Sequence, residues 1–121
     1  MGCERASPPE NGVPVDAALS GPVADAIDAE NAGDTERFLA AFTTNGAVDD
    51  WGRVFSGPEQ IRRWSDREFI GADVRLDIRS VSSSGAVTTV AAEVGGSGFN
   101  GPSNFAFTVE GNRLSLMQIT G

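Results

Sequence analysis

The chain has 121 residues, of which 40 % are hydrophobic, and this is enough for one domain with a single core. Its net charge of −8 argues against nucleic acid or a membrane surface as a partner, because both attract clustered positive charge. It has no His, Lys or Tyr and a single Cys, which excludes a Ser-His-Asp triad, a Schiff-base lysine, a His-ligated metal site and an internal disulfide. We therefore expect no metal, no cofactor, and chemistry based on carboxylates, Arg, Trp, Asn and hydroxyl groups.

Residues 1–19 combine Pro, Gly and charged residues without periodicity, which predicts a disordered tail followed by a domain over residues 20–121. No stretch approaches the ~20 apolar residues that a membrane-spanning helix needs, and the tail lacks the apolar centre of a signal peptide. We expect a cytoplasmic protein. All of the cations are Arg, and together with the abundant Ala and Gly this composition is typical of a bacterial source.

Two short helices are predicted to follow the tail. Ser20-Gly21-Pro22 is typical of a helix start, with Ser20 or Gly21 as the cap and Pro22 in the first turn. Gly33 is suited to end this helix in the left-handed conformation, and Asp34 to cap the next one. The first helix is expected to place on one face Val23, Ala26, Ile27 and Glu30. The apolar stripe of the second consists of Phe38, Leu39 and Phe42.

The next segment predicts one strand and a third helix. Residues 43–46 have the composition of a turn, after which residues 47–51 form the strand. Ser56 and Glu59 have the spacing of a capping box and predict the start of the helix, which Gly71 is expected to terminate. One face of this helix carries Ile61, Trp64 and Glu68.

The rest of the chain has the alternation and turn residues of β-structure. Four strands are expected at residues 73–81, 86–94, 104–109 and 114–119. Turns are expected at Gly85, Gly95 to Gly101 and Gly111-Asn112. Helices followed by a run of strands predict an α+β fold in which a curved antiparallel sheet wraps around the N-terminal helices. Such a cone-shaped sheet would enclose a pocket.

Two adjacent carboxylates, Asp49 and Asp50, interrupt the predicted strand. Because neighbouring strand residues point to opposite faces, Asp50 points inward if Val48 does, and Asp49 then faces solvent. A carboxylate that leaves water must be paired or must change its pKa. Asp50 is thus either a general acid/base facing a pocket or a strand-end residue that caps backbone N–H groups or pairs with Arg53.

Other side chains could complete such a site. Trp51, Trp64 and Asn104 offer neutral N–H donors, and Arg53 offers a charged one. Glu68 and Glu93 are candidate second acids, and the alternative for each is a solvent-exposed face of its helix or sheet. Phe105 and Phe107 are candidates for the pocket wall, and their alternative is the core.

Three motifs carry a resemblance to a known superfamily: Asn31-Ala32-Gly33-Asp34, Val48-Asp49-Asp50 and Phe55-Ser56-Gly57-Pro58-Glu59-Gln60-Ile61. Over residues 20–120 the chain resembles nuclear transport factor 2-like proteins, and it is most similar to their SnoaL-like and ketosteroid-isomerase-like domains. The resemblance implies the cone-shaped fold and a homodimer, and it matches Asp50 to the general-base aspartate of ketosteroid isomerases. The family's oxyanion-hole Tyr and protonated Asp fall near Ala26 and near Ser103 or Asn104, where this chain has neither residue type.

Three functions remain open at this point. The first is a cofactor-free enzyme that moves a proton on a small hydrophobic carbonyl compound, as an isomerase, cyclase or dehydratase, with Asp50 as general acid/base. The second is an epoxide hydrolase like limonene-epoxide hydrolases, with Asp50 or Glu93 and Arg53 or Arg75 imitating an Asp-Arg-Asp arrangement. The third is a non-catalytic module that binds a small hydrophobic ligand or dimerises.

Overall fold

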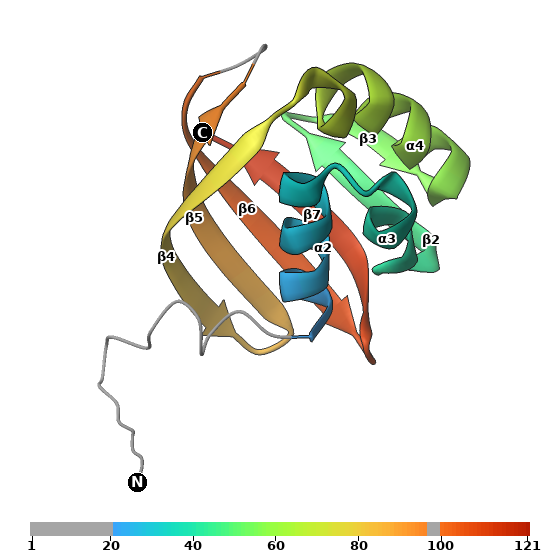
Figure 1. Cartoon of the computed structure of the whole chain (residues 1–121). Helices are drawn as coiled ribbons and strands as arrows, with labels where there is room; N and C mark the ends of the chain where they lie inside the picture. Colours follow the sequence, from blue (N-terminus) through green and yellow to red (C-terminus); the bar gives the residue numbers. More distant parts are fainter. Residues whose placement is uncertain (1–20, 97–99) are drawn as a thin grey trace, which may run out of the picture.

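The computed structural model describes residues 21–96 and 100–121 (Figure 1). Its helices are α2 (Gly21–Ala32), α3 (Thr35–Ala40), α4 (Gly57–Glu68) and the short 3₁₀ helix η1 (Ile70–Ala72). Its strands are β2 (Phe42–Asp50), β3 (Arg53–Ser56), β4 (Arg75–Ser84), β5 (Val87–Gly95), β6 (Gly101–Glu110) and β7 (Arg113–Thr120). The predicted tail at 1–19 and the Ser20 cap lie outside the described residues.

The six strands form one sheet in the order β3-β2-β7-β6-β5-β4, and the helices cover one of its faces (Figure 1). The predicted four-strand meander is present as β4 to β7, and the α+β class is confirmed. One pairing departs from an all-antiparallel sheet: β2 runs parallel to β7, with Val48 opposite Met117. The helices and the meander between these two strands supply the long connection that a parallel pair requires. Among the described residues no helix is long and apolar enough to cross a membrane.

Strand β2 begins at Phe42, so the predicted turn at residues 43–46 is wrong. Phe42 pairs with Leu114 of β7, and the register then shifts before Ala47, as in a β-bulge. Gly46 faces this junction, and a Cβ atom there would lie 2.9 Å from the carbonyl oxygen of Leu114. The turn-like composition therefore serves a bulge, because pairing with β7 outweighs the local preference.

Strand β3 was not predicted, and it matters for the site. A two-residue turn, Trp51-Gly52, joins it to β2, and both turn residues have positive φ, of 55° and 91°. This geometry is that of a tight hairpin turn, which normally contains Asn-Gly or Asp-Gly. The hairpin brings Arg53 directly opposite Asp50.

The predicted junction between the first two helices is confirmed. Gly33 has a φ of 73°, and Asp34 accepts a hydrogen bond from the backbone N–H of Arg37 at 3.1 Å. The capping box before α4 is not formed: the Ser56 hydroxyl makes no cap bond, and the Ser56 N–H donates instead to Oε1 of Gln60 at 2.9 Å. The spacing of Ser56 and Glu59 predicted the start of the helix correctly, but the side chain that bonds to the backbone of Ser56 is Gln60 and not Glu59.

Gly71 does not end α4, because the helix stops at Glu68 and Gly71 lies within η1. A Cβ atom at Gly71 would lie 1.6 Å from the backbone oxygen of Asp66, so only glycine fits this close approach. The left-handed residue that ends the turn is Asp73, with a φ of 55°.

The core lies between the helices and the inner face of the sheet. Its largest fully buried side chains are Trp64, Phe38, Phe105, Phe107, Ile61, Leu114 and Met117. Trp64 of α4 stacks on Phe69, with 4.9 Å between ring centroids, and Phe69 in turn packs near Phe105. This aromatic row joins α4 to β6 and fixes the position of the helix over the sheet.

Glu30 is the exception in the core. It lies on the inner face of α2 and is 2 % exposed, and neither carboxyl oxygen has a hydrogen-bond partner among the described residues. Burial raises the pKa of Glu30 to about 8, although the charge of Arg75 partly opposes this shift. At neutral pH the side chain is therefore a neutral carboxylic acid.

We predict that Glu30 makes the fold less stable as the pH rises. The unfolded chain releases this proton near pH 4.5 and the folded chain near pH 8, so the free energy of unfolding falls across that window. The slope approaches about 1.4 kcal/mol per pH unit. The variant Glu30→Gln has no such proton to release. In urea unfolding at several pH values, its free energy of unfolding relative to the wild type should therefore increase as the pH rises.

The control is Glu36→Gln, at an exposed carboxylate whose pKa is lowered by its hydrogen bond to Arg62. A carboxylate with a lowered pKa stabilises the fold above its unfolded pKa, and this stabilisation is lost as the pH falls toward the folded pKa. The difference in the free energy of unfolding between Glu36→Gln and the wild type should therefore be constant above pH 5. Equal pH dependence of Glu30→Gln and the wild type would contradict the prediction.

Candidate functional site

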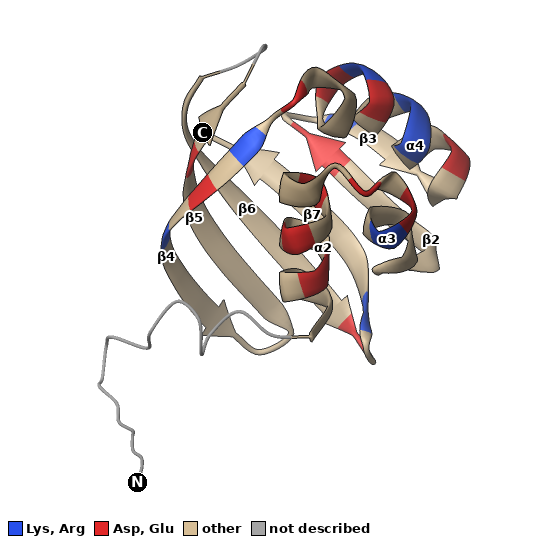
Figure 2. Cartoon of the chain, viewed as in Figure 1, with Lys and Arg blue, Asp and Glu red and all other residues tan. Residues whose placement is uncertain are grey.

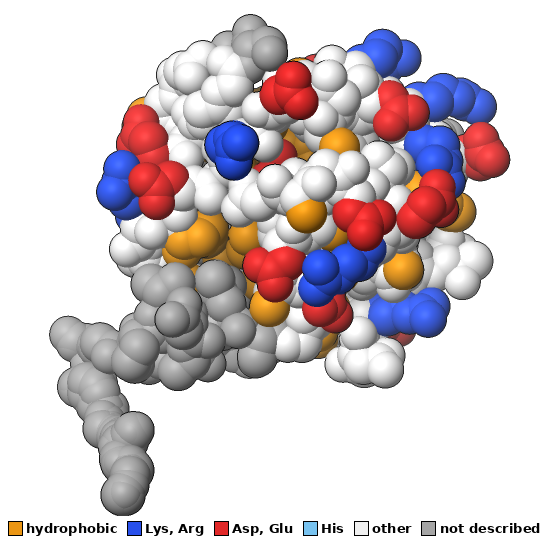
Figure 3. All heavy atoms as spheres, in the orientation of Figure 1, with side chains coloured by type: hydrophobic (Ala, Val, Ile, Leu, Met, Phe, Trp, Pro, Cys, Tyr) orange, Lys and Arg blue, Asp and Glu red, His pale blue; other side chains and the backbone are white. Residues whose placement is uncertain are grey.

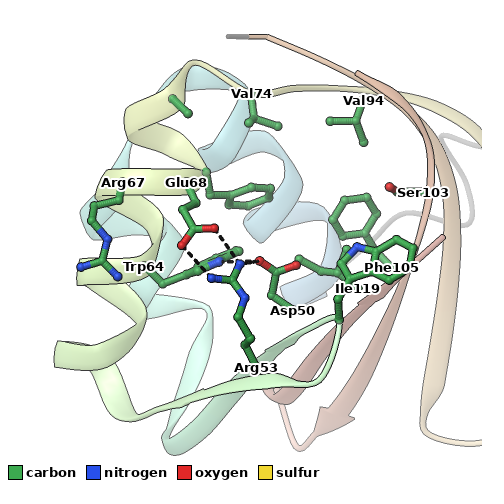
Figure 4. Close-up of a pocket in the computed structure, with 13 residues that line it drawn as sticks. Asp50, Arg53, Trp64, Arg67, Glu68, Val74, Val94, Ser103, Phe105 and Ile119 are labelled. Atoms are coloured by element: carbon green, nitrogen blue, oxygen red, sulfur yellow. Dashed lines mark hydrogen bonds and ion pairs between the residues drawn. The ribbon is translucent and has the colours of Figure 1, made fainter. Parts of the chain in front are cut away.

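A pocket of about 420 Å³ opens between α4, η1 and the inner face of the sheet (Figure 4). Its lining residues are Asp50, Trp51, Arg53, Trp64, Arg67, Glu68, Phe69, Ala72, Val74, Val94, Ser103, Phe105 and Ile119. The charged side chains come from the β2–β3 hairpin and from α4, while η1 with its flanking residues and strands β5 to β7 supply an otherwise apolar wall with Ser103 as its one polar residue. An apolar cavity with a few convergent polar groups is the usual form of a small-molecule site.

Asp50 ends β2 and points into this pocket. Val48 is fully buried on the same face of the strand, as alternation requires, and the Asp50 side chain is 14 % exposed. Its Oδ2 accepts a hydrogen bond from Nε1 of Trp64 at 3.0 Å and one from Nη2 of Arg53 at 2.5 Å. Asp50 therefore lines the pocket and also pairs with Arg53.

Arg53 bridges two carboxylates from different elements (Figure 4). Its Nη1 donates to Oε2 of Glu68 at 3.0 Å, and its Nη2 donates to Oε1 of Glu68 at 2.6 Å as well as to Asp50. This fork is the bidentate geometry that guanidinium groups form with carboxylates. The hydrogen bond to Glu68 raises the pKa of Arg53, and the same bond lowers the pKa of Glu68. Glu68 is therefore ionised at neutral pH.

Two neighbours of Asp50 shape the hairpin. Asp49 does not simply face solvent: its Oδ1 accepts a hydrogen bond from the N–H of Gly52 at 2.8 Å and closes the turn. Trp51 is 62 % exposed at the mouth of the pocket, and its backbone N–H donates to the carbonyl of Ile119 at 3.1 Å. Its indole covers Gly121, where an added Cβ atom would lie 2.3 Å from the ring.

Ser103 takes the place that Asn104 was expected to fill. Phe105 is buried and faces the core side, so alternation along β6 points Ser103 inward and Asn104 outward. Ser103 is 4 % exposed, and its hydroxyl has no hydrogen-bond partner within residues 21–96 and 100–121. The expectation for Asn104 is wrong by one position, and applying alternation from Phe105 would have corrected it.

Two further candidates do not reach the pocket. Glu93 is exposed on the outer face of β5, opposite Asp77 of β4, beside a separate surface hollow. Phe107 is 1 % exposed and lies in the core, with its ring centroid 6.4 Å from that of Phe105. Both follow from strand alternation: Glu93 lies between the buried residues Ala92 and Val94 and so faces outward.

Several lining residues were not predicted: Arg67, Phe69, Ala72, Val74, Val94, Ser103 and Ile119. The strand positions among them follow from alternation, but the segment after α4 has no periodic signal. Within the described residues, no group of three or more Cys, Asp or Glu side chains could hold a metal ion.

No family model and no curated protein matches the chain. Solved structures do. A candidate polyketide cyclase from Sinorhizobium meliloti aligns with a TM-score of 0.73 at 23 % identity, covering 82 % of this chain and 93 % of that one. An NTF2-like protein of unknown function from Cytophaga hutchinsonii gives 0.72 at 10 % identity, over 82 % and 85 % of the two chains. The chain has the nuclear transport factor 2-like fold.

A third neighbour bears on the site. The epoxide hydrolase/cyclase-like enzyme SalBIII, described for pyran ring formation in the polyether salinomycin, aligns with a TM-score of 0.72 at 20 % identity, over 81 % of this chain and 85 % of that one. The resemblance inferred from the sequence is thus confirmed for the fold. At these identities the nuclear transport factor 2-like fold is shared and the chemistry is not implied, because one fold hosts many functions.

We predict that Arg53 is the main cause of the lowered pKa of Glu68, with a smaller contribution from the charge of Arg67. In Arg53→Gln the charge and the fork are lost, so the pKa of Glu68 should rise toward or above 4.5. A titration of the side-chain carboxyl carbons by NMR measures this. Arg63→Gln, on the same helix and paired only with Glu59, should leave the pKa of Glu68 unchanged. An unchanged pKa in Arg53→Gln would mean that the bridge does not exist in solution.

Proposed function

We propose that this protein is a cofactor-independent enzyme that transfers a proton on a small hydrophobic carbonyl compound, with Asp50 as the general acid/base. The observation that supports this most is the carboxylate of Asp50 at the edge of an apolar pocket, with donors from Trp64 and Arg53. A base must be held rigidly within reach of the proton that it removes. Two hydrogen bonds to one oxygen hold Asp50 in that way and leave Oδ1 free for the substrate.

The proposed reaction begins with a carbonyl compound whose apolar body packs on Phe69, Val74 and Phe105. Asp50 removes a proton from the carbon next to the carbonyl group, and the electron pair moves onto the carbonyl oxygen as an enolate. If a C=C bond lies beside the enolate, Asp50 returns the proton to the far end of the conjugated system and an isomer forms. If the enolate carbon attacks a second carbonyl carbon of the same molecule, that C=O π bond breaks, a ring forms, and the resulting alkoxide takes the proton back from Asp50.

An enolate needs donors aimed at its oxygen. Ser103 offers an uncommitted hydroxyl on the wall formed by β6, and Arg53 offers a guanidinium on the opposite side. Asn104 was also considered for this role, but it is exposed and does not line the pocket, whereas Trp51 lines it and remains a further candidate donor. Trp64 is already committed to Asp50.

Epoxide hydrolysis is a second candidate, favoured by one specific observation: the guanidinium of Arg53 lies between the carboxylates of Asp50 and Glu68. In this reaction Asp50 takes a proton from water as the water oxygen attacks a ring carbon. The ring C–O bond breaks, and Glu68 gives a proton to the leaving oxygen, so that a diol forms. Glu68 would have to be protonated, yet Arg53 lowers its pKa. This places carbonyl chemistry first.

A purely structural module would have a filled cone, and the open pocket of about 420 Å³ counts against that alternative. A non-catalytic ligand-binding protein would have the same pocket. Because such a protein does not convert its ligand, a measurement of turnover distinguishes it from an enzyme.

We predict that Asp50→Asn abolishes enolisation. Incubation with 2-tetralone and other apolar ketones in D₂O should exchange the α-protons, followed by NMR, and loss of the base should slow this exchange by about 10²-fold or more. Asp49→Asn is the matched control, because the same chemical change at the neighbouring residue keeps an oxygen acceptor for Gly52 and should leave exchange within about twofold. Equal exchange in Asp50→Asn and the wild type would exclude Asp50 as the base.

For the epoxide candidate we predict a pH signature. Because Glu68 must carry a proton, diol formation from styrene oxide should accelerate as the pH falls toward the lowered pKa of Glu68, and Glu68→Gln should abolish this acceleration. Chromatography of the diol measures the rate. A rate that is independent of pH between 4 and 8, or that survives in Glu68→Gln, would remove this candidate.

A further inference from the structure

A second hollow lies on the other side of Arg67 from the pocket. It measures about 310 Å³ and lies between β3 and α4. Its lining residues are Val54, Phe55, Gln60, Arg63 and Arg67. Arg67 also lines the main pocket, so the two hollows share this one side chain. A ligand that leaves the pocket past Arg67 would enter the groove between β3 and α4.

Arg67 has a charge without a fixed partner. Among the described residues it forms no hydrogen bond and no ion pair, and it is solvent-exposed. Its charge makes the smallest of the contributions that lower the pKa of Glu68. It thus contrasts with Arg53, whose guanidinium is held in place by hydrogen bonds to Asp50 and Glu68.

Arg63 is nearly as free. Within residues 21–96 and 100–121 its one ion pair is with Glu59 at 4.0 Å, and the side chains of both partners are largely exposed, at 69 % and 83 %. An exposed pair at this distance holds neither side chain in place. Figures 2 and 3 show basic side chains over α4 with acidic side chains interspersed among them.

The floor of the groove is apolar. Val54 is 58 % exposed and is, with Trp51, one of two large hydrophobic side chains that the described residues leave open to solvent. Phe55 lies beside it, stacked on Trp64 of the pocket with 6.1 Å between ring centroids. A groove with an apolar floor, one arginine without a partner among the described residues and one weakly paired arginine suits a chain that carries a negative group.

We propose that the ligand of this pocket has an apolar body and an anionic tail, and that the tail passes Arg67 and binds Arg67 and Arg63 in the groove between β3 and α4. The tail ends in a carboxylate or phosphate-type anion. This inference rests on the proposed function only in using the same pocket. The net charge of −8 repels anions elsewhere on the surface, so this groove selects among apolar ligands by charge.

The test uses a neutral fluorescent probe, N-phenyl-1-naphthylamine, to report occupancy of the pocket through energy transfer from Trp64 and Trp51. Decanoate and decanol then compete with the probe. They have the same apolar chain and differ in charge. Decanoate should displace the probe at a lower concentration than decanol, and Arg67→Gln should weaken decanoate about fivefold while leaving decanol within twofold. Arg63→Gln should weaken decanoate less, and the double variant more than either.

Arg79→Gln is the matched control, because it removes one positive charge on β4, where Arg79 pairs with Asp77 at 3.3 Å, far along the chain from the groove. It should not alter displacement by either competitor. Two results would overturn the anionic tail and leave the proposed function standing. One is that Arg67→Gln weakens displacement by decanoate and by decanol to the same extent. The other is that Arg79→Gln weakens displacement by decanoate as much as Arg67→Gln does. Failure of the probe to bind at all would overturn the pocket as a ligand site, and with it both proposals.

Discussion

The site depends on one guanidinium shared by two carboxylates. Asp50 and Glu68 come from a strand and a helix, and as neighbouring negative charges beside an apolar cavity they would repel each other without Arg53. Arg53 can reach both because the Trp51-Gly52 turn places it directly opposite Asp50. The turn holds a tryptophan in the left-handed region, which is a costly conformation for a bulky residue and is typical of functional sites.

The division of the pocket into a charged side and an apolar side follows from the fold. Along each strand every second residue faces the inner side of the sheet, and the residues of strands β5 to β7 that line the pocket are uncharged. This wall therefore has no charged group that would compete for a substrate oxygen. The hairpin and α4 add Asp50, Glu68 and the arginines on one side (Figure 4). In the proposed reaction this division orients the substrate, since its apolar body has only one wall to pack on.

The fold by itself leaves the reaction open. Proteins of similar structure include a candidate polyketide cyclase and an epoxide hydrolase/cyclase-like enzyme, at identities of 23 % and 20 %. What separates these chemistries here is the protonation of Glu68. A carboxylate kept ionised by Arg53 suits a reaction that needs a base and a stabilised oxyanion, and it disfavours one that needs an acid. The free hydroxyl of Ser103 on the facing wall points the same way.

The sequence by itself determined the fold class, the helix junction at Gly33-Asp34 and the inward direction of Asp50, because turn chemistry, capping and alternation act between residues close in the chain. Alternation along β6 also implies that Ser103, and not Asn104, points inward. Only the tertiary structure decided the bulge in β2, the short strand β3 and the Arg53–Glu68 fork. These depend on pairing with β7 and on where α4 packs, and such contacts join residues distant in the chain, which leave no periodic pattern.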